Sequence, residues 1–158
     1  MSLLFEEREM ITMAGLITQQ PFFAGMRPIL LERLSYYARR SVYRADMRIF
    51  TEGGHANRCW IIRDGAVRLD AHVPGKPDAV IETLGPGAVL GWSWMFPPYT
   101  WQFGAVAIEP TLAIEFAGAE LRKLCAGDPE LGYELTRRLM AVVVERLQAT
   151  RARLISAG

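Results

Sequence analysis

Seven short runs rich in apolar residues occupy the middle of the chain, and they constrain its fold more than any other feature. They are separated by Gly, Pro, Asp and Asn, which are the residues that favour turns. Runs of this length are typical of strands, and several strands at turn spacing predict an antiparallel sandwich or barrel. The predicted strands lie at Val42 and at residues 48–50, 59–62, 66–73, 79–84, 103–108 and 112–116.

Helical patterns flank these strands on both sides. Asp128 and Pro129 are typical of a helix start, because an N-cap carboxylate accepts from free amides and proline suits the first turn. We therefore predict an α+β protein, an antiparallel double-sheet jelly-roll barrel flanked by short N-terminal helices and a long C-terminal dimerisation helix. The predicted helices span residues 2–18, 28–40, 117–125 and 129–155. The predicted single domain, 1–158, divides into N-terminal helices 1–41, a β-roll 42–117 and C-terminal helices 118–158.

The last predicted helix would extend roughly 40 Å at 1.5 Å per residue, which is longer than the domain it leaves. Its apolar stripe is too wide for one contact face, so one side is expected on the barrel and the other on a second copy. The alternative is a single helix folded back on its own domain. The predicted homodimer interface consists of Leu135, Leu139, Val143 and Leu147.

Composition excludes several classes of function. The chain has 158 residues, is 22% charged and carries a formal net charge of +1, which disfavours bulk affinity for nucleic acid or anionic membranes. Cys59 and Cys125 predict two free thiols, as expected in a reducing cytoplasm. With only His55 and His72, no motif indicates a metal site or a nucleophile with its base. We expect no catalytic residues, no metal, no cofactor and no enzymatic activity.

An uncharged aromatic segment lies at residues 84–105. Three of the four tryptophans, two phenylalanines and a tyrosine lie between Trp92 and Phe103. Aromatic side chains carry the largest apolar area per residue. The segment therefore predicts the wall of a pocket, or a surface on which something packs, that does not hold its ligand through charge.

Several motifs occur in an order shared with a known family. Pro21-Phe22-Phe23 resembles an entry motif before a first packed helix, and residues 49–56 resemble a strand and tight turn. Residues 60–69 match an aromatic strand, glycine turn and return strand, and Leu84-Gly85-Pro86-Gly87 leads into Leu90-Gly91. Together they resemble the cyclic nucleotide-binding domain family, the sensor domains similar to the catabolite activator protein. The resemblance implies a β-roll, with a phosphate-binding cassette that begins near Gly91 and a mobile long helix.

The resemblance also indicates a degenerate cassette. Family members that bind cyclic nucleotide follow the glycine with a glutamate for the ribose and, about ten residues later, an arginine for the phosphate. This chain has Trp92 and Trp101 at those positions, with Gln102 where a small hydroxyl residue stands. No lysine or arginine lies between Lys76 and Arg122. Since a charge-assisted hydrogen bond contributes roughly 1.5–3 kcal/mol, we expect no binding of cyclic AMP or cyclic GMP through the usual contacts.

These observations predict a regulatory or ligand-sensing module, with an apolar or aromatic small ligand stacked among the rings. One alternative is a ligand-free protein-interaction or scaffold subunit that uses the aromatic loop 92–103, with the aromatic residues either filling the former nucleotide site or facing outward as a contact patch. A second is a cyclic nucleotide binder with atypical contacts, such as the amides of a helical turn at residues 93–95. The sequence ends at Gly158 without a helix-turn-helix, so we expect a protein partner, no direct DNA binding and no membrane association. The predicted ligand-binding residues are Gly91, Trp92, Ser93, Trp94, Tyr99, Trp101, Gln102, Phe103 and Thr150.

Overall fold

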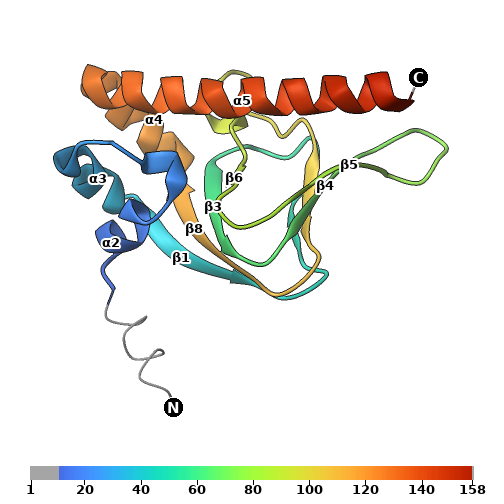
Figure 1. Cartoon of the computed structure of the whole chain (residues 1–158), viewed down its shortest axis with the longest axis horizontal. Coiled ribbons are helices and arrows are strands. Elements are labelled where there is room, and N and C mark those ends of the chain that lie inside the picture. Colours follow the sequence, from blue (N-terminus) through green and yellow to red (C-terminus); the bar gives the residue numbers. More distant parts are fainter. Residues whose placement is uncertain (1–10, 158) are drawn as a thin grey trace, which may run out of the picture. The chain divides into compact units, whose positions relative to one another are not determined.

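A computed structural model describes residues 11–157 of the chain. The chain divides into two compact units, residues 1–122 and residues 123–158. The first unit contains short helices and the β-roll, and the second contains the end of one helix and the long C-terminal helix (Figure 1). The N-terminal part of the predicted helix 2–18 lies outside the described residues, and the remainder forms α2, Met13–Thr18.

The N-terminal helices are shorter than the sequence predicts. The 3₁₀ helix η1 spans Pro21–Phe23, and α3 spans Pro28–Ser35 with its proline in the first turn. The predicted helix 28–40 is wrong at its C-terminal end, because strand β1 begins at Ala38 and continues to Tyr43. Residues 38–43 pair with a later strand along their whole length, so backbone pairing across the sheet overrides local helix propensity.

Within residues 11–157, eight strands form two four-stranded antiparallel sheets, which confirms the predicted α+β double-sheet roll. One sheet has the order β1-β8-β3-β6 and the other β2-β7-β4-β5. The predicted strands are present, but β6 has only two residues and shows no alternation from which it could be predicted. After β1, the strands are β2 (Arg48–Phe50), β3 (Arg58–Asp64), β4 (Val67–Ala71), β5 (Ala79–Leu84), β6 (Val89–Leu90), β7 (Gly104–Ala107) and β8 (Thr111–Ala117).

The core between the sheets is built from alternate residues of both. Ile62 on β3 and Val67 on β4 are fully buried there, and Phe50 and Trp60 face inward as predicted. The outer face of β8 is covered separately, since Phe116 contacts Phe23 of η1 with ring centroids 5.9 Å apart. Figure 1 shows η1, α2 and α3 on this side of the roll. The roll therefore has an inner apolar layer and a helix-covered outer face.

The second unit begins within α4, Gly118–Gly127, and continues into α5, Pro129–Ala157. The Leu131 amide donates to Asp128 Oδ1 at 3.3 Å, which confirms the predicted cap and the start at Pro129. The two helices approach closely at Gly132, where an added Cβ would lie 2.8 Å from the Cys125 carbonyl oxygen. No helix within residues 11–157 combines the length and the apolar character needed to cross a bilayer.

The apolar residues of α5 separate into two groups. Leu131, Leu135 and Leu139 are buried, and Val143 is half-buried. Of the four predicted interface residues, Leu147 is the exposed one, at 66%. It belongs to a group of exposed apolar side chains along α5, Met140, Val144, Leu147, Leu154 and Ile155.

Candidate functional site

The aromatic loop is held against the turn that follows β2. The Gly53 amide donates to the Trp101 carbonyl, and the Trp101 amide donates to the Gly54 carbonyl, both at 2.8 Å. The Ala56 amide donates to the Tyr99 carbonyl at 2.7 Å. These three backbone bonds hold residues 99–101 beside residues 53–56. The Trp101 side chain enters the roll from this segment.

Trp101 stacks inside the core. Its side chain is 4% exposed, and its ring centroid lies 3.9 Å from that of Phe50 with an interplanar angle of 19°. Trp60 lies 5.9 Å from Trp101, and Phe103 lies 5.8 Å from Phe50, also by centroid. Aromatic pairs with separations like those of Trp60–Trp101 and Phe50–Phe103 contribute about 0.5–1.5 kcal/mol beyond the area they bury. The four rings therefore form a continuous cluster within the roll.

Gly91 lies directly beneath the Trp101 ring. Its φ of +87° is a conformation that other residues rarely adopt, and an added Cβ would lie 2.8 Å from Cη2 and Cζ3 of Trp101. Glycine is thus required here for both backbone conformation and close approach. The ring of Trp101 consequently covers the residue at which the resemblance places the start of the phosphate-binding cassette.

The other predicted residues of the loop occupy different environments. Ser93 and Trp94 are buried in the predicted helical turn, which is the 3₁₀ helix η2, Ser93–Met95. Trp92 is half-buried and lies edge-on to Phe103, with centroids 6.0 Å apart. The structure thus brings Gly91, Trp92, Trp101 and Phe103 together around the roll interior.

Two predicted ligand contacts face solvent. Gln102 is exposed, and its Nε2 donates to the Thr100 carbonyl at 3.1 Å, so it is separated from the buried rings. Thr150 is exposed on α5, where its hydroxyl accepts from Arg153 at 3.2 Å. Of the loop's rings, Phe96 is the one more than half exposed, at 57%. Contact of any of these residues with a ligand stays a prediction.

Arg122 contacts the aromatic loop, which no sequence pattern predicted. From α4, it donates through Nη1 to the Trp94 carbonyl, and its guanidinium carbon lies 4.0 Å from the centre of the Tyr99 ring. The loop thus has a cationic neighbour from its own chain, and the expectation that it holds no ligand through charge stays a prediction. No pattern in residues 84–105 indicates this contact, because the cation comes from a helix outside the loop.

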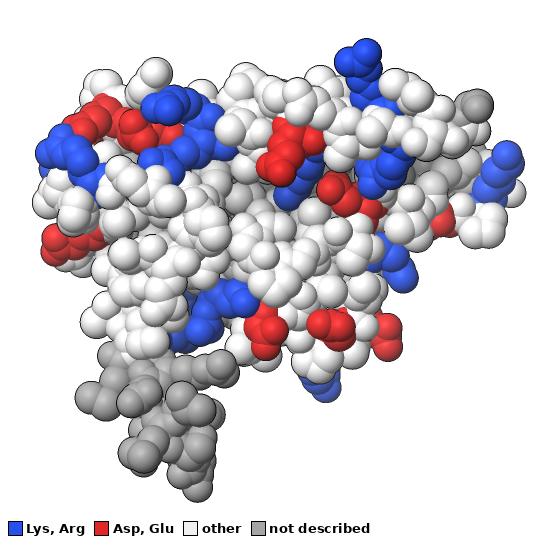
Figure 2. Space-filling view, viewed as in Figure 1, with Lys and Arg blue, Asp and Glu red and all other residues white. Residues whose placement is uncertain are grey.

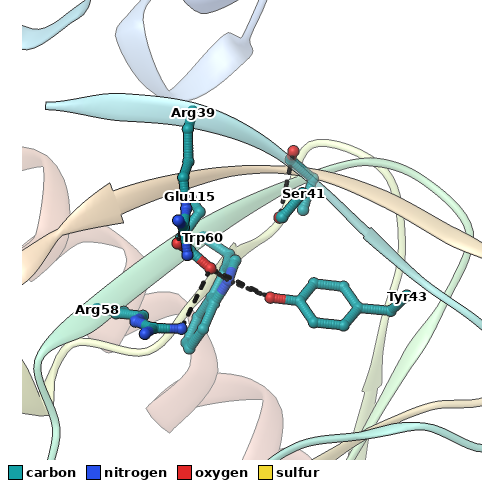
Figure 3. A network of polar contacts seen from close by, with 7 residues as sticks. Arg39, Ser41, Tyr43, Arg58, Trp60 and Glu115 are labelled. Carbon is teal, nitrogen blue, oxygen red and sulfur yellow. Dashed lines mark hydrogen bonds and ion pairs between the residues drawn. The ribbon is translucent and has the colours of Figure 1, made fainter. Parts of the chain in front are cut away.

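A polar network lies inside the roll, around Glu115 on β8. Figure 3 shows its carboxylate between Arg39, Arg58 and Tyr43, with Trp60 alongside. The Trp60 indole donates to Oε1 at 3.1 Å, and the Tyr43 hydroxyl donates to the same oxygen at 3.3 Å. Burial is the main reason that the pKa of Tyr43 is raised above 10.0. The one available signal was a glutamate inside the otherwise apolar run 112–116.

The two cysteines are free thiols. Cys59 is buried and Cys125 half-buried, and burial raises the pKa of both thiols, which keeps them protonated. No group of three His, Cys, Asp or Glu side chains within residues 11–157 is placed to hold a metal ion. On the face shown in Figure 2, basic and acidic side chains are interspersed. This distribution accords with the net charge of +1.

Comparisons with known proteins identify the class. The model of the cyclic nucleotide-binding domain family matches residues 40–128, and the chain belongs to this family. A curated relative, the CRP-like cAMP-activated global transcriptional regulator of Mycobacterium tuberculosis, is 24% identical over 138 residues. That match covers 87% of this chain and 60% of the relative, so the chain spans less than two thirds of the regulator's length.

Two solved structures show the same fold. A cyclic nucleotide-binding domain from Methylobacillus flagellatus superposes with a TM-score of 0.77 at 22% identity, covering 98% of this chain and 85% of that one. The catabolite activator protein of Thermus thermophilus superposes with a TM-score of 0.70 at 23% identity, covering 87% and 63%. The expected resemblance to sensor domains of this kind is confirmed.

Proposed function

We propose that this chain is a non-enzymatic regulatory module whose roll is filled by its own Trp101 and Phe103 rings, and that it binds neither cyclic AMP nor cyclic GMP. One observation carries the proposal: the Trp101 ring lies on Gly91, at the predicted start of the cassette. A nucleotide phosphate bound to the backbone at Gly91 would occupy the volume that the Trp101 ring fills. The module acts in this proposal without a diffusible nucleotide.

The cost of displacing Trp101 supports this proposal. Removing a buried tryptophan from a core costs about 3–5 kcal/mol, and a nucleotide would have to supply this energy before gaining any affinity. The usual cation is also missing, because Trp101 stands where the resemblance places the arginine. Arg122 does not replace it, since it is engaged with the Trp94 carbonyl and the Tyr99 ring. Binding through atypical contacts is therefore disfavoured.

An aromatic ligand among the rings is disfavoured for the same reason. Trp94, Trp101 and Phe103 are buried and lie within the packed loop and core, so a ligand would compete with them for space. For docking, the aromatic loop offers one well-exposed ring, that of Phe96, and a single ring provides only a small contact area. Between the two predictions that do not involve nucleotide, the proposal favours a ligand-free interaction module.

The exposed apolar side of α5 is the surface proposed for that interaction. Met140, Val144, Leu147 and Leu154 are exposed at intervals of four, three and seven residues, the spacing of a coiled-coil seam. We propose a homodimer through this seam, with Leu147 at its centre, and a protein partner that receives the signal. Leu135 and Leu139 are buried in the single chain and contribute to the fold in this proposal.

Calorimetry with two kinds of probe tests the proposal. Titration of the protein with cyclic AMP and cyclic GMP is expected to give no saturable heat. Trp101→Ala should create an apolar cavity that binds indole, as apolar cavities bind small aromatic molecules, whereas the wild type and Phe96→Ala should not bind it. If Trp101→Ala does not fold, Trp101→Leu tests the same cavity. Micromolar binding of either nucleotide to the wild type would overturn the proposal.

A further inference from the structure

A cavity separate from the aromatic loop opens at one end of the roll. It has a volume of about 550 Å³ and is bounded by the segment between α3 and β1, the start of β3, the end of β8 and the start of α4. Residues 84–105 do not line it. Its volume lies in the range of small-molecule sites, about 300–1,000 Å³. The polar residues in its wall include Tyr36, Arg39, Asn57, Arg58, Glu115 and Glu120.

Glu115 at the base of this cavity is already satisfied. Its side chain is 6% exposed, and an unpaired carboxylate at that depth would be costly. Trp60 and Tyr43 donate to one oxygen, and Arg39 Nε donates to the other. These contacts neutralise the carboxylate and supply three donors. Glu115 therefore does not require the second guanidinium nearby.

That second guanidinium is Arg58. Its Nη1 lies 3.7 Å from Glu115 Oε1, beyond the length of a hydrogen bond, and its side chain is 49% exposed. Arg39 uses only its Nε on Glu115, so its terminal amino groups make no bond to any residue within 11–157. Two arginines thus lie beside one buried carboxylate. Each has N–H donors that Glu115 does not use and that a ligand can engage. Arg39 and Arg58 outnumber the buried Glu115 carboxylate, and the exposed Glu120 on α4 is the second carboxylate that lines the cavity.

We infer that this cavity binds a small organic anion, whose carboxylate or phosphate is held by Arg58 together with the terminal amino groups of Arg39. The planar fork of a guanidinium matches either group with two parallel hydrogen bonds. Tyr36 lines the same cavity and is 78% exposed, so it offers a ring face to the organic part of the ligand. The cavity lies outside the aromatic loop, and Trp60 links its Glu115 to the ring cluster of the roll.

Titration with benzoate and with phenyl phosphate, followed by NMR at the arginine Nε–Hε resonances, tests the inference. The probes share a ring and differ in the anion, so they separate a carboxylate ligand from a phosphate ligand. At least one probe is expected to shift the Arg58 and Arg39 resonances saturably. Arg58→Gln should weaken binding about tenfold or more, since charge-assisted hydrogen bonds are lost. Glu120→Gln should strengthen it, because a nearby negative charge is removed.

Matched controls make the result decisive. Arg44→Gln removes one exposed arginine outside the cavity and should leave binding of both probes unchanged. Arg58→Lys keeps the charge and loses the fork, so its affinity should fall between those of wild type and Arg58→Gln; it also serves if Arg58→Gln fails to fold. Absence of saturable shifts with both probes, or equal binding by Arg58→Gln and wild type, would overturn the inference.

Discussion

Replacement of Trp101 by alanine is the most informative perturbation of the roll. The side chain is 4% exposed and stacks on Phe50 at a centroid distance of 3.9 Å. Burial of a tryptophan removes about 150–250 Å² from water, which at about 25 cal/mol per Å² corresponds to an upper estimate of about 4–6 kcal/mol. Buried tryptophan-to-alanine changes usually cost about 3–5 kcal/mol, and we expect that loss of unfolding free energy here.

Urea unfolding followed by circular dichroism measures this loss. Trp101→Phe retains one ring in the cluster and should lose about 1–2 kcal/mol. Phe96→Ala removes an exposed ring from the same loop and should change the unfolding free energy by less than about 0.5 kcal/mol. A loss below about 1 kcal/mol for Trp101→Ala, or equal losses for the two alanine variants, would refute the packing argument.

Three further predictions follow from other parts of the molecule. Gly91→Ala should cost about 2–4 kcal/mol of unfolding free energy, because it combines an unfavourable positive φ with a collision against the buried indole, while Gly85→Ala, with open space around it, should be near neutral. Equal effects in urea melts would contradict this. Because burial raises the pKa of Tyr43 above 10.0, the folded state holds the phenolic proton more tightly; this stabilisation is complete below pH 10.0 and is lost as pH rises through the raised value. The fall in stability above pH 10.0 should be shallower in Tyr43→Phe, and identical slopes would argue against it. Leu147→Glu should give a monomer in sedimentation, whereas Gln148→Glu adds the same charge beside it and should stay dimeric; an unchanged mass for both would exclude the α5 seam.

Much of the fold could be predicted because local signals and tertiary structure agree. Turn residues bound most strands, and Asp128 with Pro129 marks the start of α5 in both the sequence and the structure. The start of β1 could not be predicted, because residues 38–41 show no apolar alternation. Their extended conformation depends on pairing with β8, which is more than 70 residues away in the sequence.

The site was less predictable, because it depends on contacts between distant segments. The aromatic composition of the loop indicated a large apolar surface, and the structure places Trp101 in the core formed by Phe50 and Trp60. Neither the inward direction of this ring nor the approach of Arg122 follows from local spacing. The charge network at Glu115 combines residues from three strands, so only the isolated glutamate within an apolar run marked it.

The packing of Trp101 on Gly91 is the central claim, and nuclear Overhauser measurements test it most directly. We predict strong effects between the Trp101 Hη2 and Hζ3 protons and the Gly91 α-protons, since these groups are in contact. The same effects should persist unchanged after addition of millimolar cyclic AMP. Absence of these effects in the free protein, or their disappearance when cyclic AMP is added, would contradict the account of a roll filled by its own side chain.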